Sequence, residues 1–142
     1  MTTNTPGTTA RQMSEQQIGY LRFKVNFNDA ASGVAVNKQW LPKGAIVLRA
    51  TVQVKTAFNA ATTGTLDIGF LGGATILSAV QDVKTAAGRF AQTLATSAAT
   101  INPLAADTRV TATYASTGAA ATAGEAYVVI EYVYDNDLNV GQ

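Results

Sequence analysis

Histidine and cysteine are both absent from this 142-residue chain, and only 13% of its residues are charged. Without these two side chains there is no thiolate nucleophile, no Ser-His-Asp triad, no disulfide and none of the nitrogen or sulfur ligands that zinc usually takes. Lysine and arginine (10) nearly balance aspartate and glutamate (9), so the net charge of +1 is too small for a polyphosphate-binding protein. These absences point away from an enzyme and from direct nucleic-acid binding, and toward a structural or binding role.

Long hydrophobic runs are lacking as well. Fully apolar stretches such as 46–48 and 126–130 fall far short of the ~20 residues that a membrane-spanning helix needs. Residues 1–17 contain no apolar segment of the kind found in a secretory signal peptide. We therefore expect a soluble protein that does not enter a membrane. The lack of cysteine does not decide the redox compartment, because it suits a reducing cytosol and an extracellular particle equally.

What the chain does contain is alternation of apolar and polar residues with the period of two that is typical of strands. The alternation is clearest in segments 19–27, 45–58, 65–71, 108–114 and 126–134, and it is weaker in 34–38, 75–80 and 89–94. In the longest segment it places Ile46, Leu48, Ala50 and Val52 on the buried side. The outward side of the strands is expected to hold the basic residues Arg22, Lys24, Arg49 and Lys55.

About eight strands in one domain-sized chain indicate an all-β fold, an antiparallel β-sandwich for which an eight-stranded jelly roll is the best single interpretation. Turn residues separate the strands: 28–33 is predicted to close a hairpin, and 41–44 to form a type I turn with Pro42 in second place. Segment 77–87 could add a helical turn, and 116–124 is expected to be an exposed loop. The predicted anchors of the core are Phe23, Phe27, Phe58, Phe70 and Phe90.

The expected organisation is an extended, flexible N-terminal arm over 1–17, one β-sandwich domain over 18–135, and a C-terminal tail over 136–142. The arm is polar, rich in threonine and interrupted by Pro6, so it is not expected to join the core. Arg11, Met13 and Ile18 nevertheless give its second half anchoring groups. A disordered tail and an arm that becomes ordered on a neighbouring subunit are both open interpretations.

No catalytic, cofactor or metal site is predicted. The glycine-rich stretch 69–73 lacks the spacing of a phosphate-binding loop and is interpreted as a turn. Segment 135–137 resembles the start of a calcium loop, but the later ligands are missing. Glu125 and Glu131 are six residues apart, about 20 Å along one strand, which is too far for a glycosidase pair. Asp67 could approach Glu131 from a neighbouring strand, but nothing in the sequence establishes this.

Trp40 is the single tryptophan and lies beside the predicted turn at Pro42. The favoured interpretation is that it plugs one end of the sandwich. The alternative is a contact residue that stacks on a sugar or is buried against a partner.

Three phrases of the sequence resemble small structural proteins of tailed bacteriophages. Leu-Pro-Lys-Gly-Ala at 41–45 would open a long strand, Thr-Ala-Phe-Asn at 56–59 would close it, and Ala-Gly-Glu-Ala-Tyr-Val-Val-Ile-Glu-Tyr at 123–132 would form the last strand. The resemblance covers residues 18–135 and is to capsid decoration, or cement, proteins. It implies a β-sandwich or jelly-roll module on the outside of the phage head, often as a trimer.

The resulting hypothesis is a homo-oligomer, a trimer by this resemblance, that binds the assembled capsid lattice where major capsid subunits meet and stabilises it. It would be located on the capsid exterior of the virion, after assembly in the host cytoplasm. The candidate capsid or subunit contacts are Arg11, Met13, Ile18 and Trp40. One alternative is a head-fibre, collar or tail component that binds a host glycan; a sugar-acting enzyme or lectin domain is another.

Overall fold

The computed structural model describes residues 18–73 and 75–134. Within them the chain forms eight strands and one short helix: β1 (Gly19–Asn26), β2 (Ala35–Leu41), β3 (Ala45–Thr56), β4 (Thr63–Phe70), β5 (Gln81–Asp82), β6 (Gly88–Gln92), α1 (Ala98–Ile101), β7 (Thr108–Thr117) and β8 (Glu125–Tyr134). In this part of the chain no helix is long and apolar enough to cross a membrane. The predicted arm, 1–17, and the predicted tail, 136–142, lie outside the described residues.

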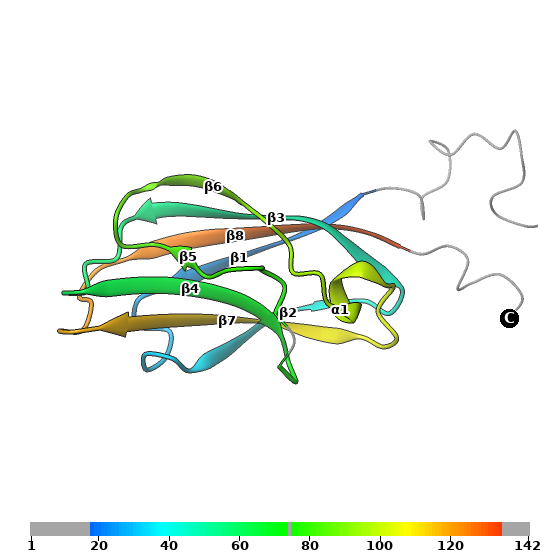
Figure 1. Ribbon diagram of the computed structural model, residues 1–142, viewed down its shortest axis with the longest axis horizontal. Coiled ribbons are helices and arrows are strands. Elements are labelled where there is room, and N and C mark those ends of the chain that lie inside the picture. Colours follow the sequence, from blue (N-terminus) through cyan, green and yellow to red (C-terminus); the bar gives the residue numbers. More distant parts are fainter. Residues whose placement is uncertain (1–17, 74, 135–142) are drawn as a thin grey trace, which may run out of the picture.

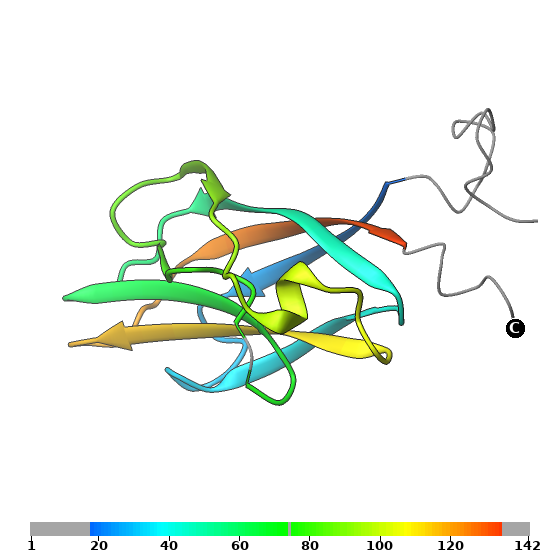
Figure 2. The same ribbon diagram turned by 45° about the vertical axis from the view of Figure 1, so that its right-hand side comes forward.

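The strands form two antiparallel four-stranded sheets that stack on each other (Figure 1). Sheet A has the order β1-β8-β3-β6, and sheet B has the order β2-β7-β4-β5. The pairs β1·β8, β2·β7, β3·β6 and β4·β5 are those of one long hairpin wrapped into two layers, which is the connectivity of a jelly roll. The predicted antiparallel β-sandwich with eight strands is therefore confirmed. Figure 2 shows the same two layers after a turn of 45°.

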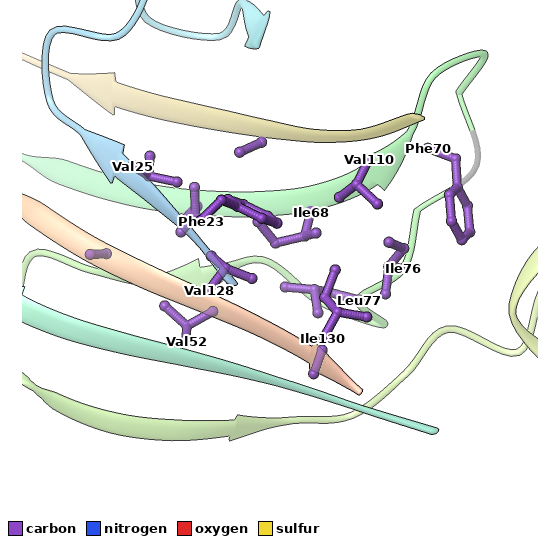
Figure 3. Close-up of a cluster of buried hydrophobic side chains, with 14 of the residues drawn as sticks. Phe23, Val25, Val52, Ile68, Phe70, Ile76, Leu77, Val110, Val128 and Ile130 are labelled. Carbon is purple, nitrogen blue, oxygen red and sulfur yellow. The ribbon is translucent and has the colours of Figure 1, made fainter. Parts of the chain in front are cut away.

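The core lies between the sheets and is built from the inward side chains of both. Phe58 is fully buried, and its ring centroid lies 4.7 Å from that of Tyr114. Side chains from sheet A, including Val128 and Ile130, meet side chains from sheet B, including Ile68 and Val110 (Figure 3). Three of the predicted phenylalanine anchors are buried and two are partly buried against the same core: Phe23, Phe58 and Phe70, then Phe27 and Phe90.

The alternation predicted for the first part of β3 is wrong. Val47 is buried, whereas Leu48 is 46% exposed, because the pairing of β3 with β8 shifts register between Val47 and Arg49. A β-bulge inserts one residue into a strand and so reverses the sides to which the residues before it point. Inward alternation resumes at Ala50, as predicted.

Two predicted turns differ from the observed connections. Segment 28–33 does not close a hairpin, since β1 belongs to sheet A and β2 to sheet B and the segment passes from one layer to the other. The turn before β3 is displaced by one residue: the Ala45 amide donates to the Pro42 carbonyl at 3.1 Å. Gly44 is thus in third place with φ +82°, the position at which a type II turn needs glycine.

The weak strand and helix predictions for residues 75–87 are also wrong. Thr75 and Leu77 form only isolated bridges, and the strand of this region is the two-residue β5. The short helix occurs later, as α1. Strand β7 also runs to Thr117, into the segment predicted to be a loop.

Side chains from β2 cover the free edge of β1. Between Asn37 and Trp40 the pairing of β2 with β7 shifts register, which brings in one extra residue. Lys38 Nζ donates to the Lys24 carbonyl at 2.8 Å, and Gln39 Nε2 donates to the Arg22 carbonyl at 3.1 Å. An edge whose carbonyls already have donors is a poor template for pairing with another strand.

Candidate functional site

The outward sides of the two sheets differ in chemistry. The outward side of sheet A, called here the charged face, carries Arg22, Lys24, Arg49, Lys55, Arg89, Glu125 and Glu131. Lys24 and Lys55 bind Glu125 at 3.0 and 3.1 Å. Arg49 donates to both carboxylate oxygens of Glu131, at 2.8 and 2.6 Å. Ion pairs and exposed cations of this kind are typical of a solvent-exposed surface.

The two lysines beside Glu125 lower the pKa of its carboxyl from the ordinary 4.5 to about 2, with a smaller contribution from a hydrogen bond with Tyr127. Arg22, on the same face, lies 4.3 Å from the centroid of the Tyr127 ring. The predicted outward positions of the four basic residues are consistent with these contacts.

The outward side of sheet B has small side chains and little charge. We call it the threonine face, and its members in β2, β4 and β7, with the residue after β4, are Ala35, Asn37, Trp40, Thr63, Thr65, Asp67, Gly69, Leu71, Arg109, Thr111, Thr113, Ala115 and Thr117. Strands β4 and β7 contain one charged residue each, Asp67 and Arg109, and the edge strand β5 adds Asp82 opposite Thr65. A nearly uncharged sheet face is unlike the charged face opposite and suits contact with another protein surface.

Register fixes the order of residues across the threonine face. Asp67 pairs with Thr113, and Gly69 pairs with Thr111. In the next row the Leu71 amide donates to the Arg109 carbonyl at 2.8 Å, and Trp40 pairs with Arg109 on the other side. Leu71, Arg109 and Trp40 therefore form one row near the start of β7, and Asp67 lies two rows away.

Arg109 and Trp40 form a cation–π pair at the edge of this face. The guanidinium carbon lies 4.5 Å from the centroid of the Trp40 ring, while Trp40 remains 51% exposed. The Nε atom of Arg109 is buried and has no hydrogen-bond partner within the described part of the chain. Tryptophan and arginine are the residue types most enriched in the energetic centres of protein interfaces.

Asp67 is a second group of the threonine face that has no ion-pair partner among the described residues. It is half-buried, and none of the ion pairs found in residues 18–73 and 75–134 involves it. Burial raises the pKa of its carboxyl above the ordinary 3.8, against a backbone hydrogen bond from Ile68 that lowers it. An open hollow of about 210 Å³ lies beside it, lined among others by Gly69, Leu71, Thr111 and Thr113.

The structure places the two predicted contact residues that it describes at different sheets. Trp40 lies on the threonine face with its ring half exposed, so the interpretation as a plug at the end of the sandwich is wrong. Ile18 is 62% exposed and precedes β1, in the other sheet. Arg11 and Met13 fall outside the described residues.

The alternation in the sequence places Asp67, Arg109 and Thr111 on the outward sides of their strands, but it does not reveal that they share one surface. That adjacency follows from the pairing of β4 with β7, which no local pattern reveals. The suggested approach of Asp67 to Glu131 does not occur, because the two residues lie in different sheets. Among the residues that the structure describes, no group of three or more carboxylate, histidine or cysteine side chains is placed to hold a metal ion.

Comparison with known proteins places the fold among phage capsid structures. No protein-family model matches the chain, and no curated protein matches it either. A chain of the capsid of Ralstonia phage GP4 has a TM-score of 0.66 and 24% identity, over 95% of this chain and 92% of that one. A chain of the Cyanophage Pam1 capsid asymmetric unit has a TM-score of 0.65 and 20% identity, over 92% and 100%.

A third solved structure is similar to a lesser degree. It is a chain of the acidic stable capsid of Helicobacter pylori bacteriophage KHP30, with a TM-score of 0.60 and 14% identity over 81% of this chain and 86% of that one. At these identities the similarity establishes the fold.

Proposed function

We propose that this protein is a structural virion protein of a tailed bacteriophage, which decorates the outside of the assembled head and cements the capsid lattice. The observation that carries the proposal is the similarity of nearly the whole chain to chains of phage capsids. Its partners are the major capsid protein, where capsid subunits meet, and further copies of itself, with a trimer as the expected oligomer.

The contrast between the two faces supports this role. A module packed on a shell needs one side adapted to water and another adapted to neighbouring protein. The charged face, with its internal ion pairs around Glu125 and Glu131, has the first character. The threonine face has the second, with only Asp67 and Arg109 charged along β4 and β7.

Stabilisation of the shell follows from linkage. A protein that binds the assembled lattice and not its separated subunits shifts the equilibrium toward the lattice, by about 2.7 kcal/mol per site when its free concentration is a hundred times its Kd. No chemical step is needed, which agrees with a chain that has no histidine or cysteine.

The test compares heads with and without this protein. Heads assembled without it are expected to open at a lower temperature than complete heads, and purified protein added back should restore the difference. The Arg89→Glu variant, altered on the charged face, should restore heat stability as well as the wild type does. Equal heat resistance of complete and deficient heads would overturn the proposal.

A host-glycan-binding component of the head fibre, collar or tail is the second candidate. The half-exposed Trp40 ring favours it, since an exposed aromatic face is suited to stacking on a sugar. A glycan array distinguishes the two: this candidate requires binding that Trp40→Ala abolishes, whereas a cement protein shows no binding that depends on Trp40.

A further inference from the structure

Two opposite charges stand at a fixed spacing on the threonine face. Asp67 pairs with Thr113, and Thr113 is four residues from Arg109 along β7. Four residues of a strand span about 13 Å. The small residues Gly69 and Thr111 lie between the two charges, and the hollow of about 210 Å³ opens there. An occupant of this face therefore needs a cation and an anion about 13 Å apart, with a side chain between them.

The sequence contains a segment with this pattern outside the folded domain. Arg11 and Glu15 are four residues apart, and Met13 lies midway between them. In an extended chain these three side chains point to the same side, about 13 Å from first to last, because alternate residues share a side. Gln12 and Ser14 then point the other way, toward water. Methionine is also the side chain best able to fill an irregular hollow.

We propose that residues 11–15 of one copy bind as an extended segment across the threonine face of a second copy. Arg11 pairs with Asp67, Met13 enters the hollow, and Glu15 pairs with Arg109. Each of the two incompletely satisfied groups of this face thereby gains a partner of opposite charge. The association needs only copies of this chain, so it does not depend on the capsid role.

The short reach of the segment favours a second copy over the same chain. Glu15 lies four positions before Gly19, the first residue of β1, and the chain between the two spans at most about 14 Å. Gly19 belongs to sheet A, and stacked sheets lie about 10 Å apart. The thickness of the sandwich alone takes up about 10 of these 14 Å, before the path also passes around the edge strand β2.

Docking of each segment on the next copy is a head-to-tail interface. Such an interface produces a ring when the rotation between copies closes. A closed ring of three copies is the expected trimer. In the bound state Asp67 faces a guanidinium, so its pKa should fall from its raised value.

The test is a charge-exchange cycle on the full-length chain, followed by analytical ultracentrifugation over a range of concentrations. Arg11→Glu and Asp67→Arg should each weaken self-association at least about tenfold, since each opposes two like charges. The double variant, Arg11→Glu with Asp67→Arg, should recover to within about threefold of the wild type. Arg89→Glu on the charged face is the matched control and should leave self-association unchanged.

Two further measurements keep the test decisive. Thermal denaturation checks that Arg11→Glu and Asp67→Arg both fold like the wild type. Emission of the single tryptophan, Trp40, should shift when the wild type is diluted and should not shift in Arg11→Glu. The proposal is overturned by a monomeric wild type, by single variants that associate like the wild type, or by a double variant as weak as the singles.

Discussion

At Gly124 the backbone passes so close to the ring of Phe58 that no larger side chain fits. A Cβ atom there would lie 2.4 Å from the Phe58 Cγ, and the φ of +148° is itself unfavourable for other residues. Gly124→Ala is expected to lower the free energy of unfolding by about 2–4 kcal/mol, measured by urea denaturation.

The matched control for this position is Gly33→Ala. Gly33 has a φ of +81°, and an added Cβ would meet nothing within 4 Å. The expected loss there is only about 1–2 kcal/mol, from backbone conformation alone. Equal losses at the two glycines would contradict the close approach to Phe58.

Two carboxyl groups should give the stability of the protein opposite dependences on pH. The folded-state pKa of Glu125 lies at about 2, below the ordinary 4.5, so its contribution to stability is present above pH 4.5 and is lost as the pH falls toward 2. The pKa of Asp67 is raised instead, so ionisation of this group opposes folding as the pH rises above 3.8.

Thermal denaturation between pH 2 and 7, on protein diluted until it is a monomer, tests both signs. Glu125→Gln should reduce the loss of stability on acidification from pH 4.5 to 2, whereas Asp67→Asn should stabilise the protein at pH 7 more than at pH 2. If Glu125→Gln has the same dependence of stability on pH as the wild type, then the ion pairs of Glu125 with the two lysines do not contribute to stability in solution.

Among the elements, the bulge in β3 decides which of two neighbouring residues contributes to the core. The amino-acid pattern alone predicts the opposite of the two. Val47 is 5% exposed and Leu48 is 46% exposed. Val47→Ala should therefore cost about 1–3 kcal/mol of unfolding free energy, and Leu48→Ala no more than about 0.5 kcal/mol. Chemical denaturation of the two variants measures both values. A larger loss at Leu48 would mean that the strand follows the uninterrupted alternation.

The elements that the sequence predicts well are the ones whose pattern is local. Strands β1, β4 and β8 have unbroken alternation, so their buried residues, such as Val25, Ile68 and Val128, can be identified from spacing alone. The bulge in β3 cannot, because it depends on how that strand pairs with β8.

The connections and the candidate site were harder to predict for the same reason. Segment 28–33 has turn residues whether it closes a hairpin or passes between layers, and only the pairing of β1 with β8 decides between them. Likewise, Asp67 and Arg109 are recognisable as outward residues, but their common face depends on the pairing of β4 with β7.

At the scale of the whole molecule, the jelly roll separates two environments. Sheet A turns a hydrated, ion-paired side outward, and sheet B turns a small-residue side outward that includes the half-exposed Trp40. A side with few charges is of little use to an isolated protein, whereas it suits a subunit packed among neighbours. The proposed docking of residues 11–15 and the proposed attachment to a capsid both place protein against that side.

The capsid role is tested most directly by counting this protein in purified virions with quantitative mass spectrometry, using the major capsid protein as the internal reference. A cement protein is expected at a copy number comparable with that of the major capsid protein, and it should remain with the heads when the tails are removed. Absence from the virion, or a copy number as low as that of a tail or collar component, would contradict the account.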